Sequence, residues 1–114
     1  MDITIAELES YLRDHYQSGG IDESLFMKLV EEVGEVAEAL NQKAGRKAMH
    51  DDNLLSHLGC ELADVIHYAV AIAALNGLDM NQILLEKDRK AAARYGHRMN
   101  LEQFVTESRS RGAG

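Results

Sequence analysis

The chain has 114 residues with a formal net charge of -7, and it contains no proline and no tryptophan. Its length suits a single domain, and its 46% content of hydrophobic residues excludes a wholly disordered chain. The acidic balance argues against direct nucleic-acid binding, because the neutralisation of phosphates requires a basic surface.

Two helices are predicted in the N-terminal part of the chain from the spacing of apolar residues. The first runs from about Thr4 to His15 and places Ile5, Leu8 and Leu12 toward a core. After a break at Gln17 to Gly20, Asp22 or Ser24 can cap the second helix. The apolar members of the second helix at core-facing spacing are Leu25, Phe26, Leu29, Val33, Val36 and Leu40.

Two further helices are predicted after a polar segment. The third extends from about Leu54 to Leu75, where the pair Asn76-Gly77 ends it. Asp79 and Gln82 form a capping-box pattern, which predicts the start of a fourth helix that ends at Gly96.

The C-terminal end is expected to be loosely held. Asn100 can cap a short extra turn through Phe104, and the residues after it resemble a flexible tail. We therefore predict an all-α fold, an antiparallel bundle of four main helices, with one domain over residues 1–106 and a tail over residues 107–114.

Cysteine content and hydropathy indicate the compartment. Cys60 stands alone, so no intramolecular disulfide is expected and a reducing compartment is the simpler interpretation. The N-terminus does not resemble a signal peptide, and the longest apolar run, Ala69 to Leu75, is far shorter than a bilayer span. We expect a cytoplasmic protein without membrane contact.

Two pairs of carboxylates border the apolar stripes of the second and third helices. Residues three apart share a helical face, so Glu32 lies beside Glu35, and Glu61 beside Asp64. If the two helices pack together, four carboxylates converge, and their repulsion requires cations. Oxygen ligands favour a hard ion such as Mg²⁺ or Mn²⁺. On spacing alone, a metal site and two solvated acidic faces remain equally open.

The residues around these pairs resemble a known family. The segments Lys28–Leu40 (KLVEEVGEVAEAL) and Glu61–Tyr68 (ELADVIHY) are similar to the signature of MazG-like nucleotide pyrophosphohydrolases, E-x-x-E followed by E-x-x-D. The resemblance extends from Lys28 to about Tyr95. The motif also has glycine at Gly34. A mid-helix glycine costs about 1 kcal/mol relative to alanine, so close approach of another helix and a merely tolerated glycine both remain open.

The resemblance implies roles for the four carboxylates. The resemblance implies that Mg²⁺ is bound by Glu32, Glu35, Glu61 and Asp64, and that Mn²⁺ is able to substitute for Mg²⁺. It also implies an all-α fold, hydrolysis of an NTP or dNTP to the monophosphate and pyrophosphate, and a homodimer or homotetramer with sites near subunit contacts. A carboxylate that the metal does not fully engage would accept a proton from the attacking water, and Glu35 is our candidate.

Candidate substrate-binding residues surround the carboxylates. Lys28 lies four residues before Glu32, so a phosphate contact and a salt bridge along the helix both remain open. Tyr68 matches a tyrosine common in the family and is expected to line the site. His57 shares the face of the second acidic pair but is interpreted as a surface histidine, and His67 as a packing or interface residue.

The predicted fourth helix carries a basic stripe. Lys87, Lys90 and Arg94 lie on one side with Tyr95 adjacent, which suggests a grip on the triphosphate or, alternatively, a solvated face balanced by acidic neighbours. Many family members have K-x-x-x-N-x-x-R-Y here. This chain has Lys87, Arg94 and Tyr95 but Ala91 in place of the asparagine, which puts one substrate contact in doubt.

Three other functions remain as alternatives. Phosphoribosyl-ATP pyrophosphohydrolase has a similar helical site, and Asp64 followed by His67 resembles it slightly. A di-iron carboxylate bundle normally requires E-x-x-H on two helices, and this chain offers only one comparable pair. A non-catalytic helical assembly module would use the acidic pairs for solubility alone. The base preference is not fixed by the sequence, and we expect the first helix and the Gln42–Asn53 loop to set it.

Overall fold

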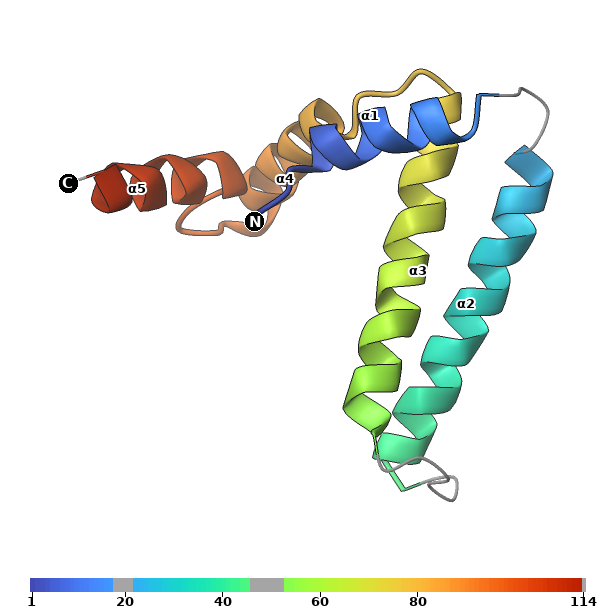
Figure 1. The fold of residues 1–114 in the computed structure, drawn as a ribbon. Coiled ribbons are helices and arrows are strands. Elements are labelled where there is room, and N and C mark those ends of the chain that lie inside the picture. Colours follow the sequence, from blue (N-terminus) through green and yellow to red (C-terminus); the bar gives the residue numbers. More distant parts are fainter. Residues whose placement is uncertain (18–21, 46–52, 114) are drawn as a thin grey trace. The chain divides into compact units, whose positions relative to one another are not determined.

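A computed structural model describes residues 1–17, 22–45 and 53–113. The regular structure in these ranges is helical: α1 (Ile5–His15), α2 (Asp22–Lys43), α3 (Leu54–Leu75), α4 (Met80–Tyr95) and α5 (Leu101–Ala113) (Figure 1). The predicted all-α class is confirmed. Residues 18–20 of the predicted break and residues 46–52 of the expected base-recognition loop lie outside the described ranges.

The chain divides into two compact units, residues 1–78 and residues 79–114. In the first unit, α2 and α3 run side by side as a long antiparallel hairpin (Figure 1). The buried and half-buried side chains of α2 recur at the spacing of one helical face; they are Leu25, Leu29, Glu32, Val36 and Ala39. The matching face of α3 comprises Leu54, Leu58, Glu61, Val65, Tyr68 and Ile72. Each helix thus contributes one carboxylate, Glu32 or Glu61, to the face between them.

A second apolar face of α2 is not covered within the described chain. Phe26, Val33 and Leu40, which we expected in the core, are 54%, 52% and 45% exposed. The expectation is wrong because α2 is apolar on two sides, and α3 covers the side that carries Leu25 and Ala39. Further exposed apolar side chains on the hairpin are Met27, Val30, Leu55, Leu62 and Ile66.

α1 lies across the C-terminal end of α3 (Figure 1). Leu12 is fully buried at this crossing, and the predicted core positions Ile5 and Leu8 are partly buried beside it, which confirms the core face of α1. The other buried members of the cluster are Leu25, Val70, Ala71 and Ala74. The two alanines have small side chains, which lets the helices approach closely at the crossing.

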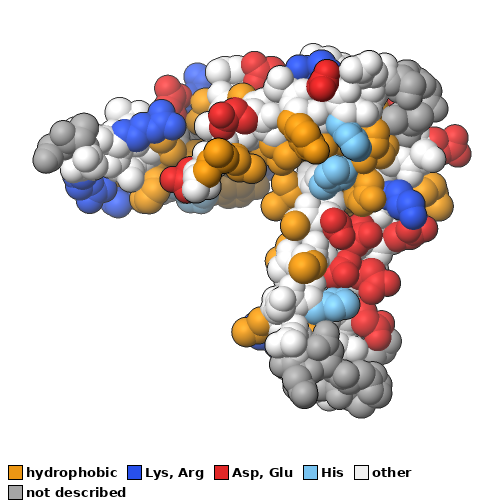
Figure 2. Space-filling model, in the orientation of Figure 1, with side chains coloured by type: hydrophobic (Ala, Val, Ile, Leu, Met, Phe, Trp, Pro, Cys, Tyr) orange, Lys and Arg blue, Asp and Glu red, His pale blue; other side chains and the backbone are white. Residues whose placement is uncertain are grey.

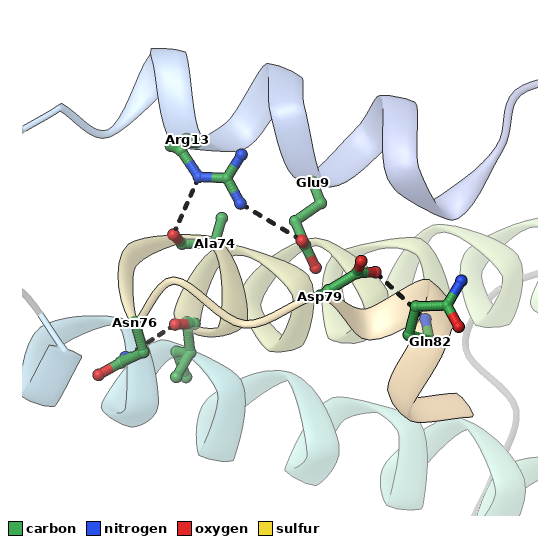
Figure 3. Close-up of polar contacts among 7 residues, drawn as sticks. Glu9, Arg13, Ala74, Asn76, Asp79 and Gln82 are labelled. Carbon is green, nitrogen blue, oxygen red and sulfur yellow. Dashed lines mark hydrogen bonds and ion pairs between the residues drawn. The ribbon is translucent and has the colours of Figure 1, made fainter. Parts of the chain in front are cut away.

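Polar contacts fasten the end of α3 to its neighbours. The Arg13 Nε donates a hydrogen bond to the carbonyl oxygen of Ala74 at 3.3 Å, and its Nη2 donates to Glu9 at 3.3 Å (Figure 3). The Asn76 side-chain amide donates to Asp22 of α2 at 2.9 Å. Because the last carbonyls of a helix lack partners within the helix, the Arg13 contact satisfies one of them.

α3 is long and apolar enough to cross a membrane by length and composition, with a mean hydropathy of 1.6 over its most apolar window. From the sequence we considered only uninterrupted apolar runs, and we therefore did not single out this helix as long enough to cross a membrane. Within the described chain, 22% of this window is buried, α1 and α2 pack against the helix, and it carries the two carboxylates Glu61 and Asp64.

The second unit contains α4 and α5. The Asp79 side chain accepts a hydrogen bond from the backbone N–H of Gln82 at 3.1 Å, and Gly96, with a φ of 66°, ends α4, as predicted. The Asp88 carboxylate of α4 accepts a hydrogen bond from the backbone N–H of Leu101 at 2.6 Å. This contact holds the start of α5 against α4.

The C-terminal residues form a longer helix than we expected. Asn100 and Gln103 exchange side-chain-to-backbone hydrogen bonds of 2.8 and 2.9 Å, which is a capping box at the start of α5. An ion pair between Glu107 and Arg111 at 3.3 Å continues the helix through Ala113. The expected short turn through Phe104 is therefore wrong, because the helix continues to Ala113. The division into a domain over residues 1–106 and a flexible tail over residues 107–114 stays a prediction.

Candidate metal centre

Three carboxylates meet on the α2–α3 hairpin. One oxygen each from Glu32, Glu61 and Asp64 lies within 4.8 Å of the others. Figure 2 shows the acidic side chains gathered over the middle of this hairpin, with histidine above and below them. Glu32 and Glu61 occupy the facing sides of the two helices, and Asp64 lies one turn further along α3 at the exposed edge.

The neighbouring carboxylates favour the protonated form of Glu32. A hydrogen bond with Glu61, partial removal from water, and the negative charges of Glu61, Asp64 and Glu35 raise the pKa of Glu32 to about 7. Two carboxylates can hydrogen-bond to each other only if one of them carries a proton. This donor set of closely spaced oxygens fits a hard divalent cation, which would replace the shared proton.

A second group adjoins the first. Glu35 is exposed one turn after Glu32, and its carboxylate lies within 4.8 Å of ligand atoms of His57 and Glu61. The His57 Nε2 is 3.3 Å from the Glu61 Oε1. Glu61 belongs to both groups and connects all four motif carboxylates. From the sequence we interpreted His57 as a surface residue and did not predict its contact with Glu61. The signal for this contact in the sequence is that the two residues are four apart on one helix.

Two residues near the acidic pair of α2, Lys28 and Gly34, are exposed to solvent. The Lys28 Nζ pairs with the Glu31 carboxylate at 3.4 Å rather than with Glu32, and both side chains are more than half exposed. A phosphate contact by Lys28 stays a prediction. A Cβ added to Gly34 would meet no atom within 4 Å, so close approach of another helix is not found there within the described chain.

Tyr68 and His67 connect the centre to α1. Tyr68, one turn beyond Asp64, is half-buried against the core, with its ring 4.9 Å from that of His67. The Tyr16 hydroxyl of α1 hydrogen-bonds to the His67 Nε2 at 2.7 Å, and burial with two neighbouring tyrosines raises the pKa of Tyr16. The packing role expected of His67 is confirmed, and the substrate contact expected of Tyr68 stays a prediction.

The basic residues of α4 belong to the other unit. Lys87, Arg94 and Tyr95 are exposed, and the Arg94 guanidinium lies 5.4 Å from the centre of the Tyr95 ring. Lys90 pairs with Glu86 at 3.6 Å, which partly supports the interpretation of a balanced, solvated face. Their role toward a triphosphate stays a prediction.

Comparisons with known proteins identify the family. Residues 21–99 match the family model of the MazG nucleotide pyrophosphohydrolase domain, and this range includes all four motif carboxylates. The crystal structure of iMazG from Vibrio DAT 722 is similar, with a TM-score of 0.63 and 26% identity over 82% of this chain and 98% of that chain. No curated protein matches the chain. The chain belongs to the MazG nucleotide pyrophosphohydrolase domain family, and its family supports nucleotide pyrophosphohydrolase activity.

Proposed function

We propose that this protein hydrolyses a nucleoside or deoxynucleoside triphosphate to the monophosphate and pyrophosphate, with Mg²⁺ as cofactor and Mn²⁺ able to substitute. The observation that supports the proposal most is the meeting of Glu32, Glu61 and Asp64 on one hairpin in a chain of the MazG family. Control of the nucleotide pool, or removal of unwanted nucleotides from the cytoplasm, is the role that such an activity would serve.

The four carboxylates have two proposed roles, binding of the cation and acceptance of a proton. Glu32, Glu61 and Asp64 would hold the divalent cation, which neutralises triphosphate charge and acidifies a bound water when present. Glu35 is exposed and lies outside this group of three. It is therefore our candidate for the base that accepts a proton from the attacking water.

The bond that breaks tests the proposal. Attack of water on the α-phosphorus releases pyrophosphate, so hydrolysis in ¹⁸O-labelled water should place the label in the monophosphate. The products are measured by mass spectrometry after incubation with canonical NTPs and dNTPs and Mg²⁺. Label in pyrophosphate, or accumulation of NDP with orthophosphate, would contradict the proposed reaction.

The uncovered apolar face supports a homodimer or homotetramer. Val33, Leu62 and Ile66 are 52%, 44% and 51% exposed in the single chain, and exposed apolar side chains that gather in one patch mark interaction sites. Ile66→Asp should shift the sedimentation coefficient toward that of a monomer, because it places a charge in the contact. Ile3→Asp, at a 66% exposed residue before α1, is the matched control and should leave the assembly unchanged.

A further inference from the structure

The group formed by Glu35, His57 and Glu61 differs in chemistry from the three-carboxylate group. It combines two carboxylates with an imidazole, and its ligand atoms come from both α2 and α3. Imidazole is a ligand for transition-metal ions, whereas Mg²⁺ prefers oxygen ligands. An ion held by this group would therefore have a different metal preference from one held by Glu32, Glu61 and Asp64.

The spacing of the imidazole and its neighbour fits joint binding of one ion. Two adjacent ligands, each about 2.1 Å from a metal ion, stand roughly 3 Å apart. The His57 Nε2 and the Glu61 Oε1 are 3.3 Å apart, so the pair requires little movement. The helix maintains this spacing, because the two residues are four apart on α3. The His57 side chain is 46% exposed and that of Glu61 is 15% exposed, so the group opens to solvent at His57.

Glu61 is the residue that the two groups share. A carboxylate has two oxygens, and it can bind one ion with each. In two-metal sites the ions lie about 3.5–4 Å apart, a separation that one bridging carboxylate spans. Glu35 can bind an ion through one oxygen and still accept a proton on the other, which is compatible with the role proposed for it above.

We propose that Glu35, His57 and Glu61 form a second metal subsite, in which the His57 imidazole is a nitrogen ligand that favours a transition-metal dication such as Mn²⁺ over Mg²⁺. The proposal rests on the proposed function only through the shared ligand Glu61. It concerns metal binding by the nucleotide-free protein and does not require that any nucleotide be hydrolysed.

Pulsed electron paramagnetic resonance of Mn²⁺ bound to the full chain tests the subsite. A directly bound imidazole nitrogen produces a ¹⁴N coupling, which we expect in the wild type and not in His57→Gln. The matched control is His67→Gln, because His67 lies on the same helix but hydrogen-bonds to Tyr16. This variant should retain the coupling. Absence of the coupling from the wild type, or its persistence in His57→Gln, would overturn the proposal.

Titration with Mn²⁺ and with Mg²⁺ gives a second readout. His57→Gln should weaken binding of one Mn²⁺ equivalent by about tenfold or more and change Mg²⁺ binding less than about twofold. If His57 forms only an ion pair with Glu61, both titrations will match the wild type, and the subsite is wrong. Hydrolysis is assayed separately. A ¹⁴N coupling without hydrolysis would reject the proposed function and support the subsite. Hydrolysis without the coupling would support the proposed function and reject the subsite.

Discussion

The two units of the chain differ in charge and in the way they are stabilised. Residues 1–78 include 14 acidic and 5 basic residues, a formal charge of -9, whereas residues 79–114 include 5 acidic and 7 basic residues, a formal charge of +2. The first unit has a core around Leu12. In the described part of the second unit, the buried hydrophobic residue is Ala92.

This difference separates two kinds of chemistry along the sequence. The first unit carries the side chains that attract cations, and the second carries an excess of side chains that attract phosphates. It also separates two sources of stability. A segment of fewer than about 40 residues with so little buried apolar surface is not expected to be stable by itself.

The largest expected effect is on catalysis, in the first unit. Glu61→Gln should lower the turnover of a triphosphate by at least about a hundredfold, because Glu61 belongs to both ligand groups and loss of even an outer partner of a metal ligand costs 10- to 100-fold. Glu38→Gln, at an exposed position of α2 outside both groups, should remain near the wild-type rate. An active Glu61→Gln enzyme would mean that the centre lies elsewhere.

The second prediction compares the stability of the two units. Leu12→Ala should reduce the free energy of unfolding by about 2–5 kcal/mol, because Leu12 is fully buried and its truncation leaves a cavity. Leu84→Ala, at a 42% exposed residue of α4, should change it by less than about 0.5 kcal/mol in a single chain. Urea unfolding measures both. A large loss for Leu84→Ala would show that the face of α4 at Leu84 is covered by a partner surface.

The third prediction concerns the pH dependence of metal binding. The pKa of Glu32 is raised from 4.5 to about 7 in the folded chain, mainly by its hydrogen bond with Glu61. The stability contributed by this proton is therefore present below pH 4.5 and is lost as the pH rises through 7. Since Mn²⁺ must displace the proton, its affinity should fall by up to about tenfold for each pH unit below 7.

Thermal unfolding measures this effect. Mn²⁺ at a hundredfold excess over its dissociation constant stabilises the fold by about 2.7 kcal/mol, and a tenfold loss of affinity reduces this to about 1.4 kcal/mol. The rise in melting temperature should therefore be larger at pH 8 than at pH 6 by a few degrees. NaCl at matched ionic strength controls for charge screening, and Asp64→Asn should diminish the rise at both pH values. An equal rise in Asp64→Asn would contradict the assigned site.

The smallest effect is expected in the second unit. Lys87→Ala and Arg94→Ala should each raise KM roughly fivefold, which corresponds to about 1 kcal/mol of lost triphosphate contact. Arg109→Ala, an exposed arginine of α5 in the same unit, is the control for a general change in charge. Equal effects of all three substitutions would favour a diffuse electrostatic field over direct contacts by α4.

Local rules predicted the helices better than the surfaces between them. The caps at Asp79 and Gly96 depend on neighbouring backbone groups, and these ends were predicted correctly. Phe26 and Val33 were not, because periodicity identifies an apolar face without showing whether it packs within the chain or on a partner. The extent of α5 was missed because the capping pair Asn100–Gln103 was interpreted as the start of one turn only.

The candidate site was predicted in part for a similar reason. The spacing of the acidic pairs placed Glu61 and Asp64 on one face, and the resemblance to the MazG family paired them with α2. Neither the spacing nor the resemblance showed that Glu61 belongs to both ligand groups, because that depends on how α3 is rotated about its axis relative to α2. His57 shared the right face of its helix, but spacing within one helix does not show that Glu35 lies across from it.

The hydrogen bond between Tyr16 and His67 has a consequence for local opening of the chain. It joins α1 to α3 one turn from Asp64, and the same crossing buries Leu12. Helices that share buried contacts tend to exchange their amide hydrogens as one cooperative unit. The amides of α1 should therefore exchange together with those of the C-terminal half of α3, and Tyr16→Phe should accelerate the exchange of both segments while α4 and α5 remain unchanged.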